Sequence, residues 1–134
     1  DTPRRAMGHL LGNAVRIAPA DQSLVLGEGI ETMLSVREAA PSLPVWAALS
    51  SGHLGAVLLP DGLQRLYIAI DRDPAGQRAA ERLTARATEA GSAVRVVVPR
   101  LGDFDDDLRA HGAKALRQHL AQQIDLKDQH RLTI

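Results

Sequence analysis

Acidic side chains gather in three short segments of this 134-residue sequence. Glu28 lies between two glycines. Asp71 and Asp73 are two positions apart, so on an extended backbone both side chains point to the same side. The third segment, residues 102–107, contains four aspartates. Carboxylates grouped in this way are typical of a site that holds a cation.

Crowding these negative charges together costs free energy. Two unit charges about 5 Å apart repel by roughly 3 kcal/mol at an effective dielectric constant near 20. A divalent cation relieves that repulsion, and ligands that are all oxygen suit Mg²⁺ or Mn²⁺. Such an ion would hold phosphate oxygens and stabilise the charge that develops during phosphoryl chemistry.

Each acidic segment also has a purely structural interpretation. Asp73 directly precedes Pro74, as the N-cap residue of a helix often does. Glu28 could be an acid near a helix N-terminus, where the helix dipole contributes about 0.3–1 kcal/mol. The run at residues 102–107 could be the solvated start of a helix. The sequence leaves these roles open beside metal ligation.

Short β-branched runs alternate with helical stretches along the chain. Strict alternation favours an α/β fold, with an about four-stranded, mainly parallel sheet flanked by helices. Ligands bind beyond the carboxyl ends of the strands in such sheets, and the acidic segments follow three of the four main strands. We expect strands at residues 13–18 (an edge strand), 23–27, 44–49, 66–70 and 93–98, and helices at residues 30–40, 74–90 and 105–123 with a break at Gly112.

These motifs resemble the Toprim domain, the metal-binding unit of topoisomerases, bacterial-type DNA primases and some nucleases. Glu28 in Gly-Glu-Gly-Ile-Glu-Thr is similar to its first motif, and Asp71 and Asp73 in Ile-Asp-Arg-Asp-Pro-Ala-Gly are similar to its second. The Ala-Gly that ends this second motif resembles the sequence found in the primase branch of the family. Residues 102–108 are similar to the Lys-Asp-x-Asn-Asp-Leu segment of primase-like proteins from phages, plasmids and mobile elements. The resemblance runs from about residue 23 to residue 108 and implies the Rossmann-like Toprim fold.

The resemblance also implies roles for individual acids. Glu28 would act as a metal ligand or as a general base or acid. Asp71 and Asp73 would hold one or two Mg²⁺ or Mn²⁺ ions that bind nucleotide phosphates. Asp103 and Asp106 would add ligands at the outer edge of the site, where the lysine of the family's acidic loop is absent from this sequence.

Three further residues are candidates for supporting roles. Glu31 lies one helical turn after Glu28 and either supports it or is a plain helix-surface acid. Arg72 replaces the small or amide residue that is common between the two aspartates, and it is a candidate phosphate contact. Arg78 is another, because it begins a stripe with Arg82 and Arg86 that either touches a nucleic-acid backbone or pairs with nearby glutamates.

We expect three segments in the chain: a tail of a preceding primase subdomain or an edge strand at residues 1–20, the Toprim domain at 21–124, and a C-terminal tail at 125–134. Residues 12–17 resemble the end of that preceding subdomain, and the start at Asp1 leads us to expect a fragment of a longer protein. The resemblance implies a DNA primase-type nucleotidyltransferase that makes RNA primers from ribonucleotides on single-stranded DNA. An upstream primase subdomain and a helicase domain or partner would accompany it.

Composition narrows the class of protein. The sequence has 16 basic and 16 acidic side chains, 2% aromatic residues and no cysteine. These values exclude disulfide scaffolds and cysteine zinc sites, and they provide neither a base-stacking platform nor a broad basic surface. We therefore expect the isolated domain to be inactive in primer synthesis. No apolar run approaches the roughly 20 residues of a membrane span, and we expect a cytoplasmic location with no membrane partner.

Three other functions remain open. A Toprim nuclease would use the same acids to cleave phosphodiesters. A haloacid-dehalogenase-like phosphatase also carries Asp-x-Asp, although that motif requires Thr or Val where this chain has Ala75. A non-catalytic Toprim-like module would keep the fold only to bind DNA or a partner protein.

Overall fold

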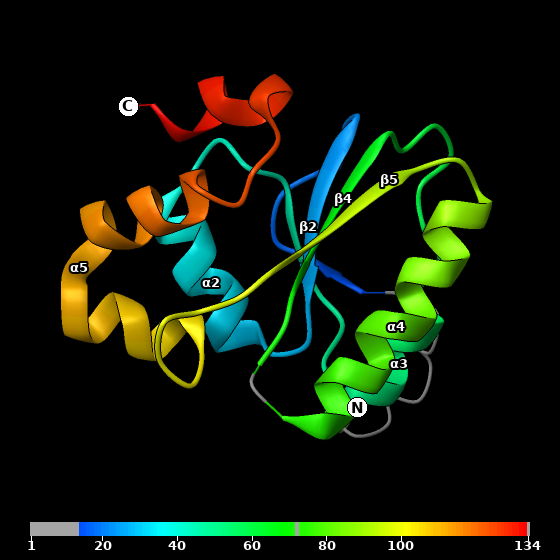
Figure 1. The fold of residues 1–134 in the computed structure, drawn as a ribbon, viewed down its shortest axis with the longest axis horizontal. Helices are drawn as coiled ribbons and strands as arrows, with labels where there is room; N and C mark the ends of the chain where they lie inside the picture. Colours follow the sequence, from blue (N-terminus) through cyan, green and yellow to red (C-terminus); the bar gives the residue numbers. More distant parts are fainter. Residues whose placement is uncertain (1–13, 72, 134) are drawn as a thin grey trace, which may run out of the picture.

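The computed structural model describes residues 14–71 and 73–133, so Arg72 and the first part of the expected 1–20 segment lie outside the described residues. Strands and helices alternate along the chain (Figure 1). In order they are β1 (Val15–Arg16), β2 (Ser23–Gly27), α2 (Ile30–Ala39), β3 (Val45–Ala47), α3 (Ser51–Ala56), β4 (Arg65–Ala69), α4 (Pro74–Glu89), β5 (Ala93–Val97), α5 (Phe104–Ala121) and the 3-10 helix η1 (Leu126–Leu132).

The described residues form one five-stranded sheet in the order β1-β3-β2-β4-β5. Neighbours from β3 to β5 are parallel, and only the two-residue edge strand β1 runs antiparallel to β3. Gly27 at the end of β2 is in register with Ala47 of β3 and Ala69 of β4. These three strands therefore end level with one another. The predicted α/β fold with a mainly parallel sheet is confirmed.

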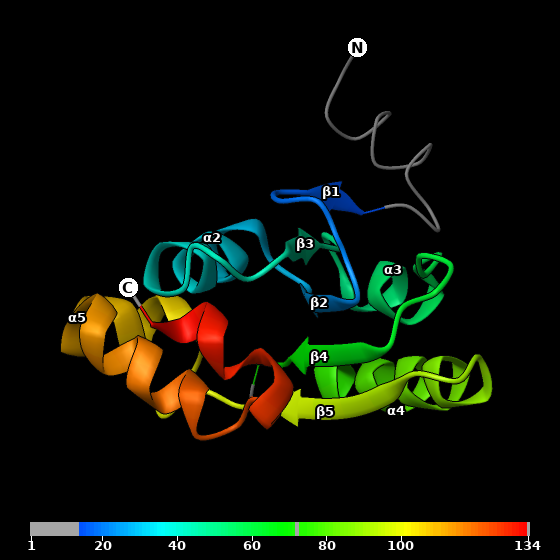
Figure 2. The ribbon, with the colours of Figure 1, turned by 90° about the horizontal axis from the view of Figure 1, so that it is seen from above.

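Two helical layers cover the two faces of the sheet. Helices α2 and α5 with η1 lie on one face, and α3 and α4 lie on the other (Figure 2). The α2–α5 side encloses a core that includes Met33, Tyr67 and Phe104, all at most 1% exposed. The α3–α4 side encloses a second core that includes Leu54 and Leu83. The central strands β2, β3 and β4 are buried between these layers, which explains their nearly continuous apolar sequence.

Two details of the helices follow from local sequence. Pro74 occupies the first turn of α4, where its missing N–H costs nothing. Gly112 interrupts α5 with φ of +86° and ψ of 167°, a conformation that L side chains rarely adopt. The break predicted at this glycine is confirmed.

The C-terminal segment, expected as a tail, forms the 3-10 helix η1 and packs onto the core through Leu132. Its Asp128 is fully buried. The Asp128 carboxylate accepts hydrogen bonds from Ser23 Oγ at 2.8 Å, Tyr67 Oη at 2.5 Å and Arg65 Nε at 2.8 Å. Since Ser23 and Arg65 begin β2 and β4, Asp128 closes the end of the sheet opposite the acidic segments.

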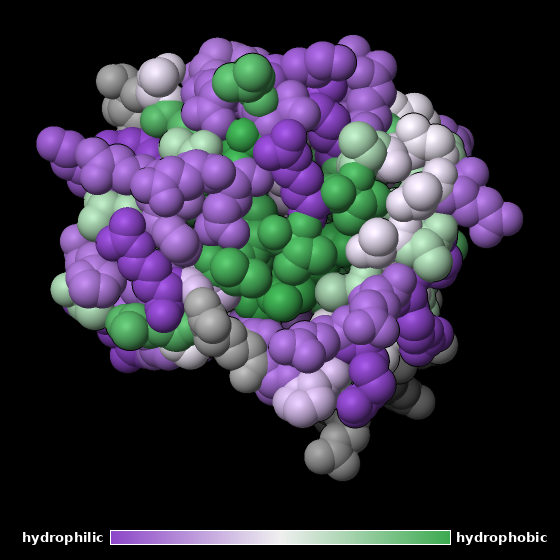
Figure 3. Space-filling model, in the orientation of Figure 1, coloured by the Kyte–Doolittle hydropathy of each residue, from purple (hydrophilic) through white to green (hydrophobic). Residues whose placement is uncertain are grey.

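The β5 edge leaves apolar surface exposed. Figure 3 shows apolar residues gathered in the middle of one face, with polar residues around them. A groove of about 520 Å³ between β5 and α4 is lined by Ile70, Ala80 and Val96 among others. The side chain of Val96 is 42% exposed.

Candidate metal centre

Glu28 lies in the loop that follows β2, and the backbone around it is tightly packed. A Cβ on Gly27 would lie 2.3 Å from Met33 Sδ and 3.0 Å from the carbonyl oxygen of Ala69, so only glycine fits there without a shift. The Glu28 carbonyl accepts a hydrogen bond from the backbone N–H of Leu49 at 2.6 Å. This bond ties the loop after β2 to the loop after β3. The fold therefore fixes the backbone from which the Glu28 carboxylate projects.

Asp71 and Asp73 lie in the short connection between β4 and α4. The N–H of Asp73 donates to the Asp71 carbonyl at 2.9 Å, which turns the chain into the helix. Asp73 is the N-cap, and its Oδ1 accepts from the N–H of Gly76 at 2.6 Å. A Cβ on Gly76 would lie 3.2 Å from that same oxygen, so glycine permits the close approach. The predicted capping role of Asp73 is confirmed.

The three carboxylates of Glu28, Asp71 and Asp73 converge. Each offers one oxygen, and these oxygens all lie within 4.8 Å of one another. Glu28 and Asp71 are half-buried. At that separation each pair of charges repels by about 3 kcal/mol at an effective dielectric constant near 20. We call this group the acid triad. Three close carboxylates form a donor set that fits a hard divalent cation.

Electrostatics single out Asp71. Burial raises the pKa of the Asp71 carboxyl to about 6, with further contributions from the negative charges of Glu28, Asp103, Asp73 and Asp106. A bound cation would reverse this effect by favouring the charged form. The raised pKa of Asp71 thus reflects its burial first and the neighbouring negative charges second.

Asp103 and Asp106 are near enough to act on Asp71 but are not members of the acid triad. Asp103 caps α5 by accepting from the N–H of Asp106 at 2.7 Å. The Asp106 side chain is 45% exposed and lies 3.9 Å from Arg109. Their expected ligand roles therefore remain predictions, and a cation at the triad would feel their charge from the rim.

Asp107 is a residue whose role the sequence did not reveal. It is 2% exposed, and its carboxylate accepts from the backbone N–H groups of Arg100 and Leu101, each at 2.7 Å. These bonds hold the loop between β5 and α5 that carries Asp103. Within a run of four aspartates, sequence type cannot separate this buried loop anchor from its solvated neighbours.

The remaining predicted residues lie outside the acid triad. Glu31 is exposed on α2 and borders a shallow groove with Ser35 and Asp105, so its supporting role stays a prediction. Arg78 is exposed on α4. Arg72 lies outside the described residues, and its phosphate contact also stays a prediction.

Comparison with known families decides the class of domain. The family model described as the Toprim domain matches residues 23–114, which include the acid triad and the loop at residues 102–107. The chain belongs to the Toprim family. No curated protein matches the sequence as a relative. A haloacid-dehalogenase-like phosphatase would belong to a different family, so the Toprim match argues against that alternative.

A solved structure points to the primase-like branch of the Toprim family. The Aquifex aeolicus primase, solved as its zinc-binding and RNA polymerase domains, aligns with a TM-score of 0.53 and 26% sequence identity. The alignment covers 78% of this chain and 27% of the Aquifex chain. This Toprim domain is thus of primase-like type, and it spans about a quarter of the solved primase.

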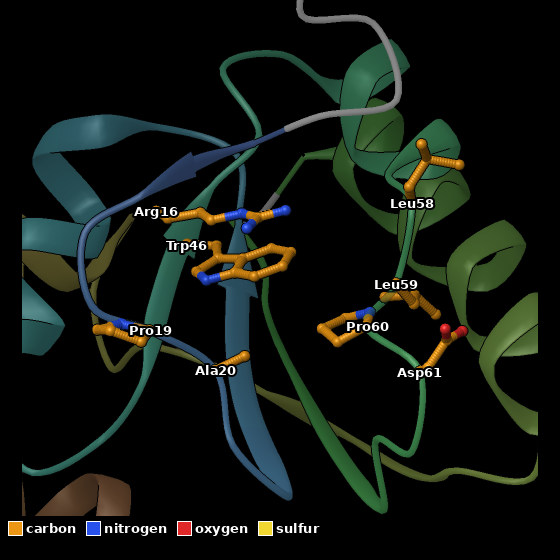
Figure 4. A pocket seen from close by; sticks show the side chains of 8 residues that line it. All are labelled: Arg16, Pro19, Ala20, Trp46, Leu58, Leu59, Pro60 and Asp61. Atoms are coloured by element: carbon orange, nitrogen blue, oxygen red, sulfur yellow. The ribbon is translucent and has the colours of Figure 1, made fainter.

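A separate pocket of about 630 Å³ lies beside the edge strand β1 (Figure 4). The Arg16 guanidinium carbon lies 4.6 Å above the centre of the Trp46 ring, and Pro60 and Asp61 line the other side. Trp46 is 3% exposed, and its indole Nε1 has no hydrogen-bond partner among the described residues. The pocket contains no grouped carboxylates, so its chemistry differs from that of the acid triad.

None of the described helices has the length and apolar character required to cross a bilayer.

Proposed function

We propose that this chain is the catalytic Toprim domain of a DNA primase-like protein that makes RNA primers on single-stranded DNA. The observation that carries the proposal is the convergence of Glu28, Asp71 and Asp73 within 4.8 Å beyond the ends of two adjacent parallel strands. The likeness to the Aquifex primase supports primer synthesis over phosphodiester cleavage.

The acid triad fits Mg²⁺ or Mn²⁺ through its donor chemistry. Glu28, Asp71 and Asp73 would hold the ion, with Asp103 and Asp106 adding negative charge at the rim. The ion would supply charge stabilisation at the phosphate oxygens of the incoming nucleotide. Asp73 is held by the first turn of α4, so one of its oxygens stays fixed whether or not the other binds a ligand.

Primer extension requires a balanced exchange at phosphorus. The 3′ oxygen of the primer bonds to the α-phosphorus of a ribonucleoside triphosphate, the bond to pyrophosphate breaks, and the hydroxyl proton leaves. Glu28 is half-buried beside Asp71 and is the residue proposed to act as the ligand or to take that proton. Asp71 would hold the ion in its ionised form, and its raised pKa of about 6 in the metal-free protein leaves a protonated fraction near neutral pH.

The test is primer synthesis by the longer protein in which we expect this domain, with single-stranded DNA, ribonucleotides and Mn²⁺. Glu28→Gln should abolish synthesis, because it removes a triad charge while keeping the side-chain shape. Glu38→Gln is the matched control: Glu38 is an exposed acid on α2 outside the triad. Degradation of the DNA without synthesis would favour the nuclease alternative, and synthesis undiminished in Glu28→Gln would refute the proposal.

A further inference from the structure

A further pocket lies along α4, and its lining includes Ala75 in the first turn of that helix. It measures about 330 Å³ and lies between α3 and α4, which run next to each other (Figures 1 and 2). Helix α4 begins at the triad residue Asp73, and α3 begins four residues after β3 ends at the same rim. The pocket is lined by Ser51, Gly52, Ala75, Arg78, Ala79 and Arg82.

The two arginines of this pocket, Arg78 and Arg82, lack acidic partners in the part of the chain that the structure describes. Both are exposed, and neither forms an ion pair with any described residue, Glu81 and Glu89 included. Arg86, the third member of the stripe, is different: its guanidinium donates to the carbonyl oxygens of Gly55 and Val57 at 2.7 and 2.8 Å. Arg86 therefore links α4 to the end of α3 through these two hydrogen bonds. Arg78 and Arg82 make no such bonds to described residues.

No hydrogen bond or ion pair among the described residues accounts for the positions of Arg78 and Arg82. Arg78 lies in the second turn of α4, close to the helix start that carries the triad residue Asp73. The Arg82 guanidinium lies flat against α3, where a Cβ on Gly55 would come within 3.3 Å of Cζ. Glycine at that point leaves room for the planar group beside α3, and the Arg82 side chain also lines the pocket. A guanidinium arranged in this way is suited to two parallel hydrogen bonds with a phosphate.

We infer that the α3–α4 pocket binds a phosphate group of the nucleic-acid strand or nucleotide that is engaged at the acid triad. This inference rests on the proposed function. Arg78 is five residues beyond Asp73, which places it about 7.5 Å further along the helix axis. A ligand held by a cation at the triad would thus meet a second, permanently positive site on the same helix. The Ser51 hydroxyl at the pocket wall can donate a further hydrogen bond.

The test is a fluorescence-anisotropy titration of a labelled single-stranded oligodeoxynucleotide with this chain in Mn²⁺, at several salt concentrations. We expect the double variant Arg78→Gln/Arg82→Gln to bind more weakly. Its plot of log affinity against log salt concentration should be shallower by about 1.4, because each phosphate contact on a single strand contributes about 0.7. Arg78→Lys/Arg82→Lys should restore the slope, since it restores both charges.

A matched control removes the same charge elsewhere. Arg95→Gln/Lys127→Gln takes two exposed cations from β5 and η1, and its affinity and slope should match the wild type. A parallel titration with a ribonucleoside triphosphate distinguishes the ligand: an effect of the pocket variant on the triphosphate alone assigns the pocket to the nucleotide.

Two results would overturn the inference: no effect of the pocket variant on either ligand, or an equal effect of the control variant. Mn²⁺ binding measured on the pocket variant separates this failure from failure of the proposed function. The pocket variant should bind Mn²⁺ as the wild type does, because the acid triad is intact. A wild type that binds Mn²⁺ but neither phosphate ligand would also refute the inference.

Discussion

The substitution Asp71→Asn should stabilise the metal-free domain at neutral pH, although it removes a residue of the proposed active site. The pKa of Asp71 is raised to about 6 by burial and by neighbouring carboxylates, against an ordinary value of 3.8. Between about pH 4 and pH 6 the folded state therefore binds more protons than the unfolded state. The free energy of unfolding falls as pH rises through that window, and the loss is complete above pH 6.

The size of the effect follows from that shift. Two pKa units correspond to about 3 kcal/mol, and solvent screening at this half-buried carboxylate reduces the expected effect to about 1–2 kcal/mol. Asparagine has nearly the same side-chain shape as aspartate but carries no charge. No described residue donates a hydrogen bond to the Asp71 carboxylate, so the substitution should cost little in return.

The assay is urea unfolding followed by circular dichroism, in EDTA, at pH 4 and pH 7.5. Asp71→Asn should match the wild type at pH 4 and exceed it by about 1–2 kcal/mol at pH 7.5. Asp61→Asn, at an exposed acid outside the triad, controls for loss of one negative charge. A variant that is several kcal/mol less stable at pH 7.5 would show that Asp71 is a structural acceptor, and the charge-crowding argument would be wrong.

Three other outcomes are expected. Asp73→Ala should lower the free energy of unfolding by about 0.5–2 kcal/mol through loss of the α4 cap, and Asp73→Asn should keep most of that stability, both measured by urea unfolding. Asp128→Ala should cost about 3–5 kcal/mol by the same method, because it removes a fully buried acid and leaves the largely buried side chain of Arg65 without its acidic partner. Hydrogen bonds from Arg65, Tyr67 and Ser23 outweigh burial and hold the pKa of Asp128 below its usual range, so its stabilisation is present above pH 4 and lost as pH falls further. The isolated chain should make no primers in a synthesis assay, because its balanced charge offers no broad basic surface for a template; robust synthesis would contradict this.

The sequence predicted much of the fold because the relevant signals are local. Buried strands appear as short β-branched runs, Pro74 marks a helix start, and Gly112 marks a helix break. The acids at strand ends followed from topology, since parallel strands of one sheet deliver their carboxyl ends to one rim. Register then made Glu28 and Asp71 neighbours.

The roles of Asp128 and Arg86 could not be predicted from the sequence, because they depend on contacts between residues that are distant in the chain. Asp128 lies in a short polar segment, and its burial depends on Ser23, 105 positions away. Nothing in the local pattern separates such a residue from a solvated tail. Similarly, Arg82 and Arg86 are equivalent by helical spacing, yet only Arg86 reaches the carbonyl groups at the end of α3. Tertiary packing therefore gives Arg86 a structural role, whereas Arg78 and Arg82 have no such contact among the described residues.

The central claim is that Glu28, Asp71 and Asp73 hold one divalent-metal site. The most direct measurement is anomalous diffraction from crystals of this chain soaked in Mn²⁺. We expect an anomalous peak among these three carboxylates in the wild type and its loss in Asp71→Asn. A wild-type crystal with no peak at the triad, or with Mn²⁺ bound only elsewhere, would contradict the central claim.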